Sequence, residues 1–167
     1  MPLRMIVTEG EDCLTKKCRE IVKFDARLHE LLDDMKETLE KADGAGLAAP
    51  QVGVLRACAV VALEDGSFAE LVNPKILSFG GEQNGLEGCL SVPGVWGKVT
   101  RPLTVTVTAT DRYGKPFEMT GEGFLARALC HEIDHLSGHL FTERVTEYVD
   151  IEQLEKEAAK LEKEATQ

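Results

Sequence analysis

Two histidines and a glutamate in the stretch His131-Glu132-Ile133-Asp134-His135 are the side chains of this sequence best suited to chemistry. On a helix, residues four apart lie on one face, one turn above the other. Both imidazoles can therefore reach one divalent transition metal ion, for which neutral imidazole is a good ligand. Glu132 follows the first histidine directly, close enough to exchange a proton with water there without being a ligand itself. The alternative is an amphipathic helix that happens to carry two surface histidines.

A catalytic metal site needs a third protein ligand and an open position for water. His139 is a poor candidate because it follows Gly138, which ends the predicted helix. The metalloprotease pattern with a third histidine requires it at position 141, which holds Phe141. A downstream glutamate, Glu152 or Glu155, would complete a different type of metallopeptidase site, and its spacing does not exclude it.

Cys89 is the better candidate for the third ligand. It lies in a glycine-rich stretch, residues 85–94, where the backbone can approach an ion or a substrate closely. A thiolate is a strong ligand for a borderline-soft metal, although most free cysteines are small buried hydrophobes. A structural, non-catalytic site is a further alternative, but such sites usually have a fourth protein ligand.

The whole-chain composition is that of a soluble globular protein. Its length of 167 residues predicts one domain, residues 1–167, that can bury a substantial core. No apolar run has the length of a membrane span, and the N-terminus lacks the apolar core of an export signal, so we expect a cytoplasmic protein with no membrane partner. Five cysteines, an odd number, do not predict a disulfide framework. A net charge of -10 argues against DNA as a partner, and a monomer is the default expectation.

Hydrophobic periodicity predicts three helices in an α+β protein in which the motif helix packs on strands. The first helix follows an Asp25 N-cap and ends near Ala42, the motif helix runs from about Glu122 to Ser137, and the last begins near Ile151. The predicted strands are residues 56–63, 70–77 with a bend at Asn73-Pro74, and 104–110, which a turn at 111–115 joins to 116–119.

Three motifs in this sequence resemble the signature motifs of the peptide deformylase family. They are GAGLAAPQ at Gly44–Gln51, EGCLS at Glu87–Ser91 and HEIDH at His131–His135, in the order of the family and at about its spacing. The resemblance extends over essentially the whole chain. Cys130 departs from it, because many members carry glutamine before the first histidine, and we expect Cys130 to pack rather than bind metal. Ala45 and Gly85 are small where some members carry larger apolar residues.

The resemblance implies that Cys89, His131 and His135 hold one ion per chain, usually Fe(II). The same ligands would accept Zn(II), Ni(II) or Co(II). The implied fold is mixed α+β, with mainly antiparallel sheets packed around the central HEIDH helix and a C-terminal helix. The implied reaction removes the formyl group from the formyl-methionine that begins a new polypeptide, giving formate and a free amine. The expected partners are nascent formyl-methionyl peptides and, transiently, the ribosome.

The resemblance also assigns roles around the ion. Glu132 would carry the proton from water to the departing amine, while the Gln51 side-chain amide and the Leu90 backbone N–H would stabilise the oxygen that becomes negative. Glu87 and Arg101 are expected to form an ion pair that steadies the Cys89 segment. The residues expected to contact the substrate are Gly44, Ala45, Gly46, Gly88, Phe124 and Ala128. The last two would line an apolar pocket for the methionine side chain, with ordinary core packing as the alternative.

Overall fold

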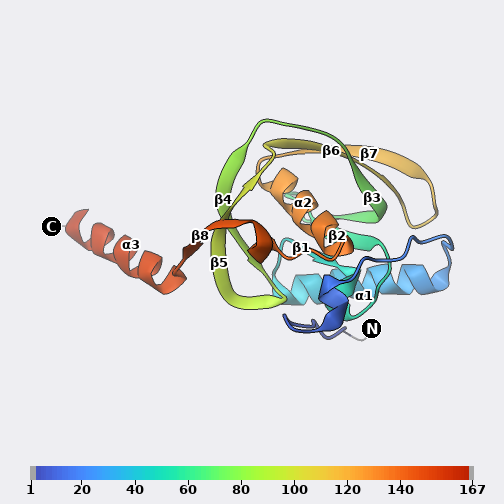
Figure 1. The fold of residues 1–167 in the computed structure, drawn as a ribbon, viewed down its shortest axis with the longest axis horizontal. Helices are drawn as coiled ribbons and strands as arrows, with labels where there is room; N and C mark the ends of the chain where they lie inside the picture. Colours follow the sequence, from blue (N-terminus) through green and yellow to red (C-terminus); the bar gives the residue numbers. More distant parts are fainter. Residues whose placement is uncertain (1–2, 166–167) are drawn as a thin grey trace.

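The computed structural model describes residues 3–165 and contains two antiparallel sheets that surround the helix α2 (Phe124–Leu136) (Figure 1). The larger sheet has the strand order β1-β2-β3-β6-β7, formed by β1 (Gly46–Ala48), β2 (Cys58–Ala62), β3 (Phe68–Gly80), β6 (Thr104–Thr110) and β7 (Pro116–Glu122). The smaller has the order β4-β5-β8, formed by β4 (Gln83–Cys89), β5 (Val92–Arg101) and β8 (Val145–Val149). The other elements are α1 (Ala26–Ala42), α3 (Ile151–Ala165) and the short 3-10 helices η1 (Asp12–Thr15), η2 (Ala49–Val52) and η3 (Phe141–Arg144). The α+β class predicted from the sequence is confirmed.

The strands of the larger sheet follow the predicted alternation. In β6, Val105, Val107 and Ala109 are buried while the threonines between them are partly exposed, as a period of two requires. The predicted hairpin pairs β6 with β7, which continues beyond the expected end to Glu122. The predicted bend in β3 is also present: Asn73 has a φ of 51° and the register shifts there. The side chain of Asn73 holds the bend by bonding both backbone groups of Ile21 at 2.8 Å, and the strand then continues to Gly80 in its pairing with β6.

The smaller sheet was not predicted, because no strand was assigned between residues 83 and 101. Glycine has a low strand propensity, and Gly85, Gly88 and Gly97 hide the pattern. Close neighbours require glycine at two of these positions, Gly88 and Gly97. A Cβ at Gly88 would lie 2.6 Å from the Trp96 ring, and one at Gly97 would lie 2.7 Å from Val145. The glycines therefore allow close packing within and around this sheet.

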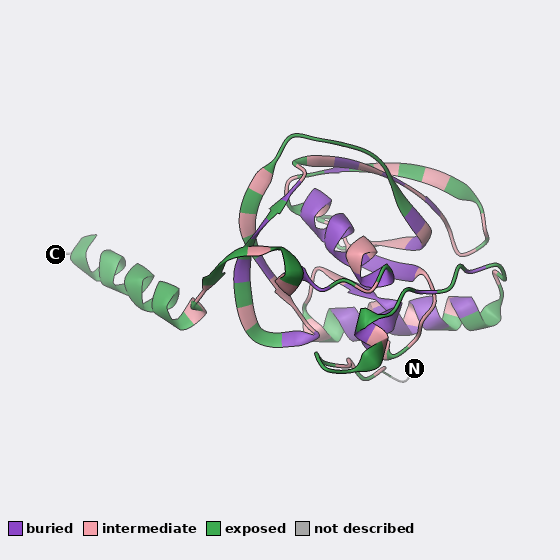
Figure 2. Cartoon of the chain, viewed as in Figure 1, coloured by how far each residue is buried: buried purple, intermediate pink, exposed green. Residues whose placement is uncertain are grey.

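Helix α2 is the most enclosed helix of the described chain, and Figure 2 shows it buried along most of its length. It begins two residues after the predicted start because Gly123 has a φ of 62°, outside the right-handed helical region. It ends before Gly138, whose φ of 83° matches the predicted stop. Strands of both sheets contact the helix, so its polar residues lie inside the protein.

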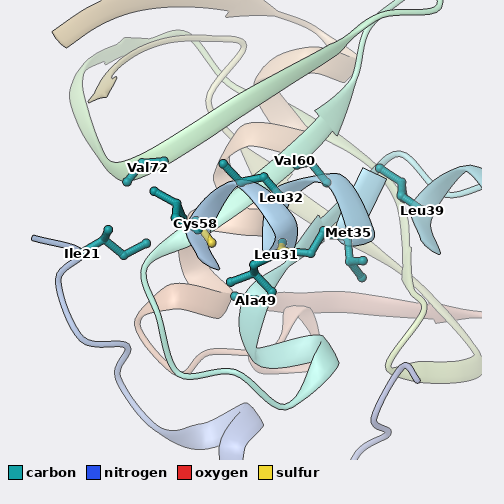
Figure 3. Packing of buried hydrophobic residues seen from close by; sticks show 11 residues of the cluster. Ile21, Leu31, Leu32, Met35, Leu39, Ala49, Cys58, Val60 and Val72 are labelled. Carbon is teal, nitrogen blue, oxygen red and sulfur yellow. The ribbon is translucent and has the colours of Figure 1, made fainter. Parts of the chain in front are cut away.

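Helix α1 covers the larger sheet and forms much of its core. The side chain of Asp25 accepts the N–H of Leu28 at 3.1 Å, which confirms the predicted N-cap. The helix buries the predicted apolar stripe against β1 and β2, and Figure 3 shows Leu32 and Met35 beside Cys58 and Val60. All five cysteines are free thiols, in agreement with the sequence.

Helix α3 differs from the other two in having no buried residue along 151–165. It extends away from the sheets (Figure 1), and Figure 2 shows it exposed along nearly its whole length. Leu154 and Leu161, on the predicted apolar side, are 44% and 67% exposed. None of the helices within residues 3–165 is long and apolar enough to span a membrane.

The different burial of two helical leucines gives a test of this fold. Leu32→Ala should lower the free energy of unfolding by about 2–5 kcal/mol, because it leaves a cavity in a closed core. Leu161→Ala, the matched control on α3, should change it by no more than about 0.5 kcal/mol. Denaturant unfolding of both variants measures the difference. Equal destabilisation would show that α3 packs against the rest of the protein.

Candidate metal centre

Three potential metal ligands from two elements converge beneath the smaller sheet. Cys89 lies at the end of β4, and His131 and His135 lie one turn apart on α2. The Cys89 Sγ is 3.3 Å from His135 Nε2, which is 3.2 Å from His131 Nε2. The ligand atoms of all three residues lie within 4.8 Å of one another. The structure thus brings together the three residues that the sequence pattern selected.

The spacing of these atoms suits a tetrahedral ion. Bonds of about 2.0–2.1 Å to nitrogen and about 2.3 Å to sulfur place two nitrogens about 3.3 Å apart and nitrogen and sulfur about 3.6 Å apart. The observed separations of 3.2 and 3.3 Å are close to these values. One thiolate and two imidazoles also match the preferences of borderline-soft divalent metals. These residues therefore fit such an ion and leave a fourth position for water or substrate.

The carboxylate of Glu87 fixes the orientation of His131. Its Oε1 accepts from His131 Nδ1 at 2.8 Å, which directs Nε2 toward the other ligand atoms. The predicted ion pair with Arg101 is present at 2.9 and 3.0 Å, and Arg101 is only 4% exposed. Burial alone would raise the pKa of Glu87, but bonds from His131 and Arg101 lower it to about 2. Sequence reasoning missed Arg127, whose Nη1 also donates to Glu87, at 2.7 Å.

Glu132 points its carboxylate into the same region. The residue is 3% exposed, and its Oε1 has no hydrogen-bond partner among the described residues. Its Oε2 lies beside Gly46, where a Cβ would approach to 2.5 Å. Burial raises the pKa of Glu132 to about 7, although the charge of His131 acts in the opposite direction. A carboxylate with this pKa can accept and return a proton near neutral pH.

Gln51 connects the glycine-rich segment to the cysteine. Its Oε1 accepts the N–H of Ala48 at 2.9 Å and so caps the end of that segment. Its Nε2 lies 3.6 Å from Cys89 Sγ and 3.2 Å from Ser91 Oγ, so the amide also faces the candidate metal centre. The two ends of this side-chain amide thus have different roles: Oε1 holds the glycine-rich segment, and Nε2 faces the cysteine.

A cavity of about 620 Å³ opens beside these residues. Its wall includes Gln51, Leu90, His131, Glu132 and all six residues expected to contact the substrate, namely Gly44, Ala45, Gly46, Gly88, Phe124 and Ala128. Phe124 is 68% exposed, so core packing does not explain it. Ala128 is buried and also belongs to an apolar cluster of the core. The cavity has the size of a small-molecule or peptide-end site.

The other candidate ligands lie elsewhere. His139 is exposed and contacts Glu143 at 3.3 Å. Glu152 and Glu155 are exposed on α3, which Figure 1 shows well away from α2. The alternative of a downstream-glutamate metallopeptidase is therefore wrong. Cys130 is buried in an apolar cluster, where burial raises the pKa of its thiol, as the packing interpretation predicted.

Comparison with known proteins identifies the family of this chain. A sequence model of the family described as polypeptide deformylase matches residues 3–150. The peptide deformylase of Caldicellulosiruptor bescii is 52% identical over 155 residues, which cover 93% of each chain. The chain belongs to the polypeptide deformylase family. As a member, it is a metal-dependent hydrolase that removes the N-formyl group from the methionine at the start of new polypeptides.

Solved deformylase structures share its fold. The crystal structure of a peptide deformylase from Legionella pneumophila is 44% identical, with a TM-score of 0.84 over 87% of each chain. That of the peptide deformylase from Thermotoga maritima is 33% identical, with a TM-score of 0.85 over 87% of this chain and 99% of the other. The sheets around α2 are thus the fold of this family.

The contact between Gly46 and Glu132 can be tested by adding one methyl group. Gly46→Ala would place its Cβ 2.5 Å from Glu132 Oε2 and should displace that carboxylate in this deformylase. A displacement near 1 Å costs on the order of 100-fold in rate, so formate release should fall by about this factor while metal content stays unchanged. Gly80→Ala is the control, because its Cβ would meet only Thr104 Oγ1, at 3.4 Å. Full activity of Gly46→Ala would contradict the observed position of Glu132.

Proposed function

We propose that Cys89, His131 and His135 hold one divalent ion per chain, and that this ion is Fe(II) in the cell. The convergence of their ligand atoms within 4.8 Å supports the site. The resemblance of the three motifs to those of deformylases supports iron, while Zn(II), Ni(II) and Co(II) suit the same ligands. A divalent ion bound here supplies Lewis-acid activation of water at neutral pH.

Glu132 is the proton carrier of the proposed reaction. It takes a proton from the water that attacks the formyl carbon and gives it to the amine nitrogen when the C–N bond breaks. The buried carboxylate of Glu132, beside three convergent ligand atoms and with a free Oε1 among the described residues, is the observation on which this assignment rests.

Two donors are assigned to the formyl oxygen, which gains negative charge during attack. The Nε2 group of Gln51 faces the candidate metal centre and is held from behind by the bond of Oε1 to Ala48. Leu90 follows Cys89 directly and lines the cavity, so its backbone N–H is the second donor. Donors fixed before the reaction favour the transition state over the ground state.

The substrate peptide is proposed to bind as an extended strand along β1. This strand is at the edge of its sheet, and Ala62 donates its N–H to Ala45 O at 2.8 Å. Bonding alternates along an antiparallel pair, so Gly46 directs its N–H and C=O away from β2. A peptide can pair with these groups. Gly88 leaves room on the opposite wall, and Phe124 and Ala128 bound the space for the methionine side chain.

The setting of the enzyme follows from its substrate. We infer a single domain, acting as a monomer in the cytoplasm, where nascent formyl-methionyl peptides leave the ribosome. Transient ribosome association is part of this proposal. Residues 150–167 carry six acidic residues and three lysines, a poor electrostatic match for RNA, so a surface other than α3 should face the ribosomal RNA.

Glu132→Gln tests the proton carrier. The variant keeps the shape of the side chain but loses the base, so formate release from a formyl-methionyl peptide should fall by about 10²–10⁴-fold. Metal content by elemental analysis should stay at one ion per chain, because Glu132 is not a ligand. Near-normal turnover in the fully metallated variant would overturn the assignment.

The two cysteines nearest the centre test the ligand set. Cys89→Ala should lose both its iron and its deformylase activity, because a thiolate ligand is removed. Cys130→Ser, the matched control, should keep both and lose only stability, since Cys130 packs in the core. Elemental analysis and formate release measure the two properties. A Cys89→Ala protein with a full complement of metal and full turnover would exclude the proposed ligands. A structural site is indicated instead if the unaltered protein holds metal but releases no formate.

A further inference from the structure

Asp134 is the one acidic residue of the HEIDH motif to which neither the ligand set nor the reaction gives a task. It is 16% exposed and lies between two arginines. Its Oδ2 accepts from Arg101 Nη1 at 2.7 Å and from Arg144 Nε at 2.8 Å. Arg101 is buried, whereas Arg144 is about half exposed.

Three successive contacts connect Asp134 to a proposed metal ligand. Asp134 bonds Arg101 at 2.7 Å, Arg101 bonds Glu87 at 2.9 and 3.0 Å, and Glu87 bonds His131 Nδ1 at 2.8 Å. The carboxylates of this series, those of Asp134 and Glu87, are both largely buried. The series leads from α2 through β5 and β4 and back to α2, so no local segment contains it.

The charges of this network decide what Asp134 contributes. Glu87 receives two buried guanidinium groups, those of Arg101 and Arg127, and these three groups together carry a charge of +1 beside a cation site. An excess positive charge opposes a divalent cation, and buried charges are poorly screened. The negative charge of Asp134 brings the four groups to neutrality. The charge of Arg144 lies near solvent and is screened more strongly.

We propose that Asp134 is a positioning residue for the metal centre and acts through Arg101 and Glu87. Its charge holds Arg101 and offsets one of the two guanidinium charges on Glu87. Glu87 then remains a strong acceptor for His131, and the network does not repel a cation. This inference rests on the proposed metal site.

Asp134→Asn tests the charge, because asparagine keeps an oxygen acceptor for Arg101 and removes only the negative charge. Zn(II)-loaded full-length protein is titrated with a competing chelator to obtain the affinity for Zn(II). The variant should bind Zn(II) about tenfold more weakly, the lower end of the range for a residue that contacts a ligand directly, because Asp134 acts on His131 through Arg101 and Glu87. The matched control is Asp33→Asn, which removes the same charge from the pair with Arg112 Nη2 at 2.7 Å, away from the centre. Its affinity should be unchanged.

Arg144→Gln distinguishes this electrostatic role from a purely structural role of Asp134. Without the charge of Arg144, the negative charge of Asp134 acts more strongly on Arg101, so the affinity for Zn(II) should stay the same or increase. If Asp134 only held neighbouring segments together, both Arg144→Gln and Asp134→Asn would weaken Zn(II) binding. Weaker binding in Arg144→Gln therefore overturns the inference. Unaltered affinity in Asp134→Asn also overturns it. Failure of the unaltered protein and of Asp33→Asn to bind Zn(II) would instead overturn the metal site itself, and this inference with it.

Discussion

The buried carboxylate of Glu87 is the interaction on which the arrangement of this deformylase depends. It joins β4 to β5 and to α2 by accepting from Arg101, Arg127 and His131 at once. A buried charge is tolerated when its neighbours compensate it, and removal of one partner of such a pair costs about 3–5 kcal/mol. The hairpin of β4 and β5 is therefore held in one position over the helix. Cys89 follows two residues later, which places its sulfur 3.3 Å from His135 Nε2.

Glycine supplies the space that this crowded arrangement needs. Gly46 lets the edge strand β1 lie against Glu132, where a Cβ would be 2.5 Å from the carboxylate oxygen. Gly88 lets β4 lie against the ring of Trp96 in the same way. Both glycines line the cavity. Because they have no side chain, the cavity wall can lie close to the proposed catalytic glutamate while its backbone stays accessible to a peptide. The glycines of these motifs thus prevent steric clashes in the site as well as allowing turns.

Sequence patterns predicted those helices and strands that are determined by residues close together in the sequence. The Asp25 cap and the leucine stripe determine α1, and the alternation of threonine with valine and alanine determines β6. The smaller sheet could not be predicted in this way, because the reasons for Gly85, Gly88 and Gly97 lie in distant neighbours such as Arg127 and Val145. In the site, helical spacing was enough to pair His131 with His135. Cys89 and Gln51 stood out mainly by resemblance to a family. Arg127 and Asp134 escaped notice because their ion pairs join residues 33 to 40 positions apart in the sequence.

The enclosure of α2 explains how the fold can keep a reactive carboxylate inside it. A buried acceptor without a partner costs about 1–3 kcal/mol, and Oε1 of Glu132 has no partner among the described residues. A helix at the surface could relieve this cost by rotating the side chain into solvent. In α2 the strands of both sheets block that movement, and Gly46 lies directly against the other oxygen. The apolar packing of Ala126 and Leu129 holds the helix in place and offsets the cost. The carboxylate consequently remains available to a proton of water or substrate, because no residue in the described part of the chain donates a hydrogen bond to Oε1.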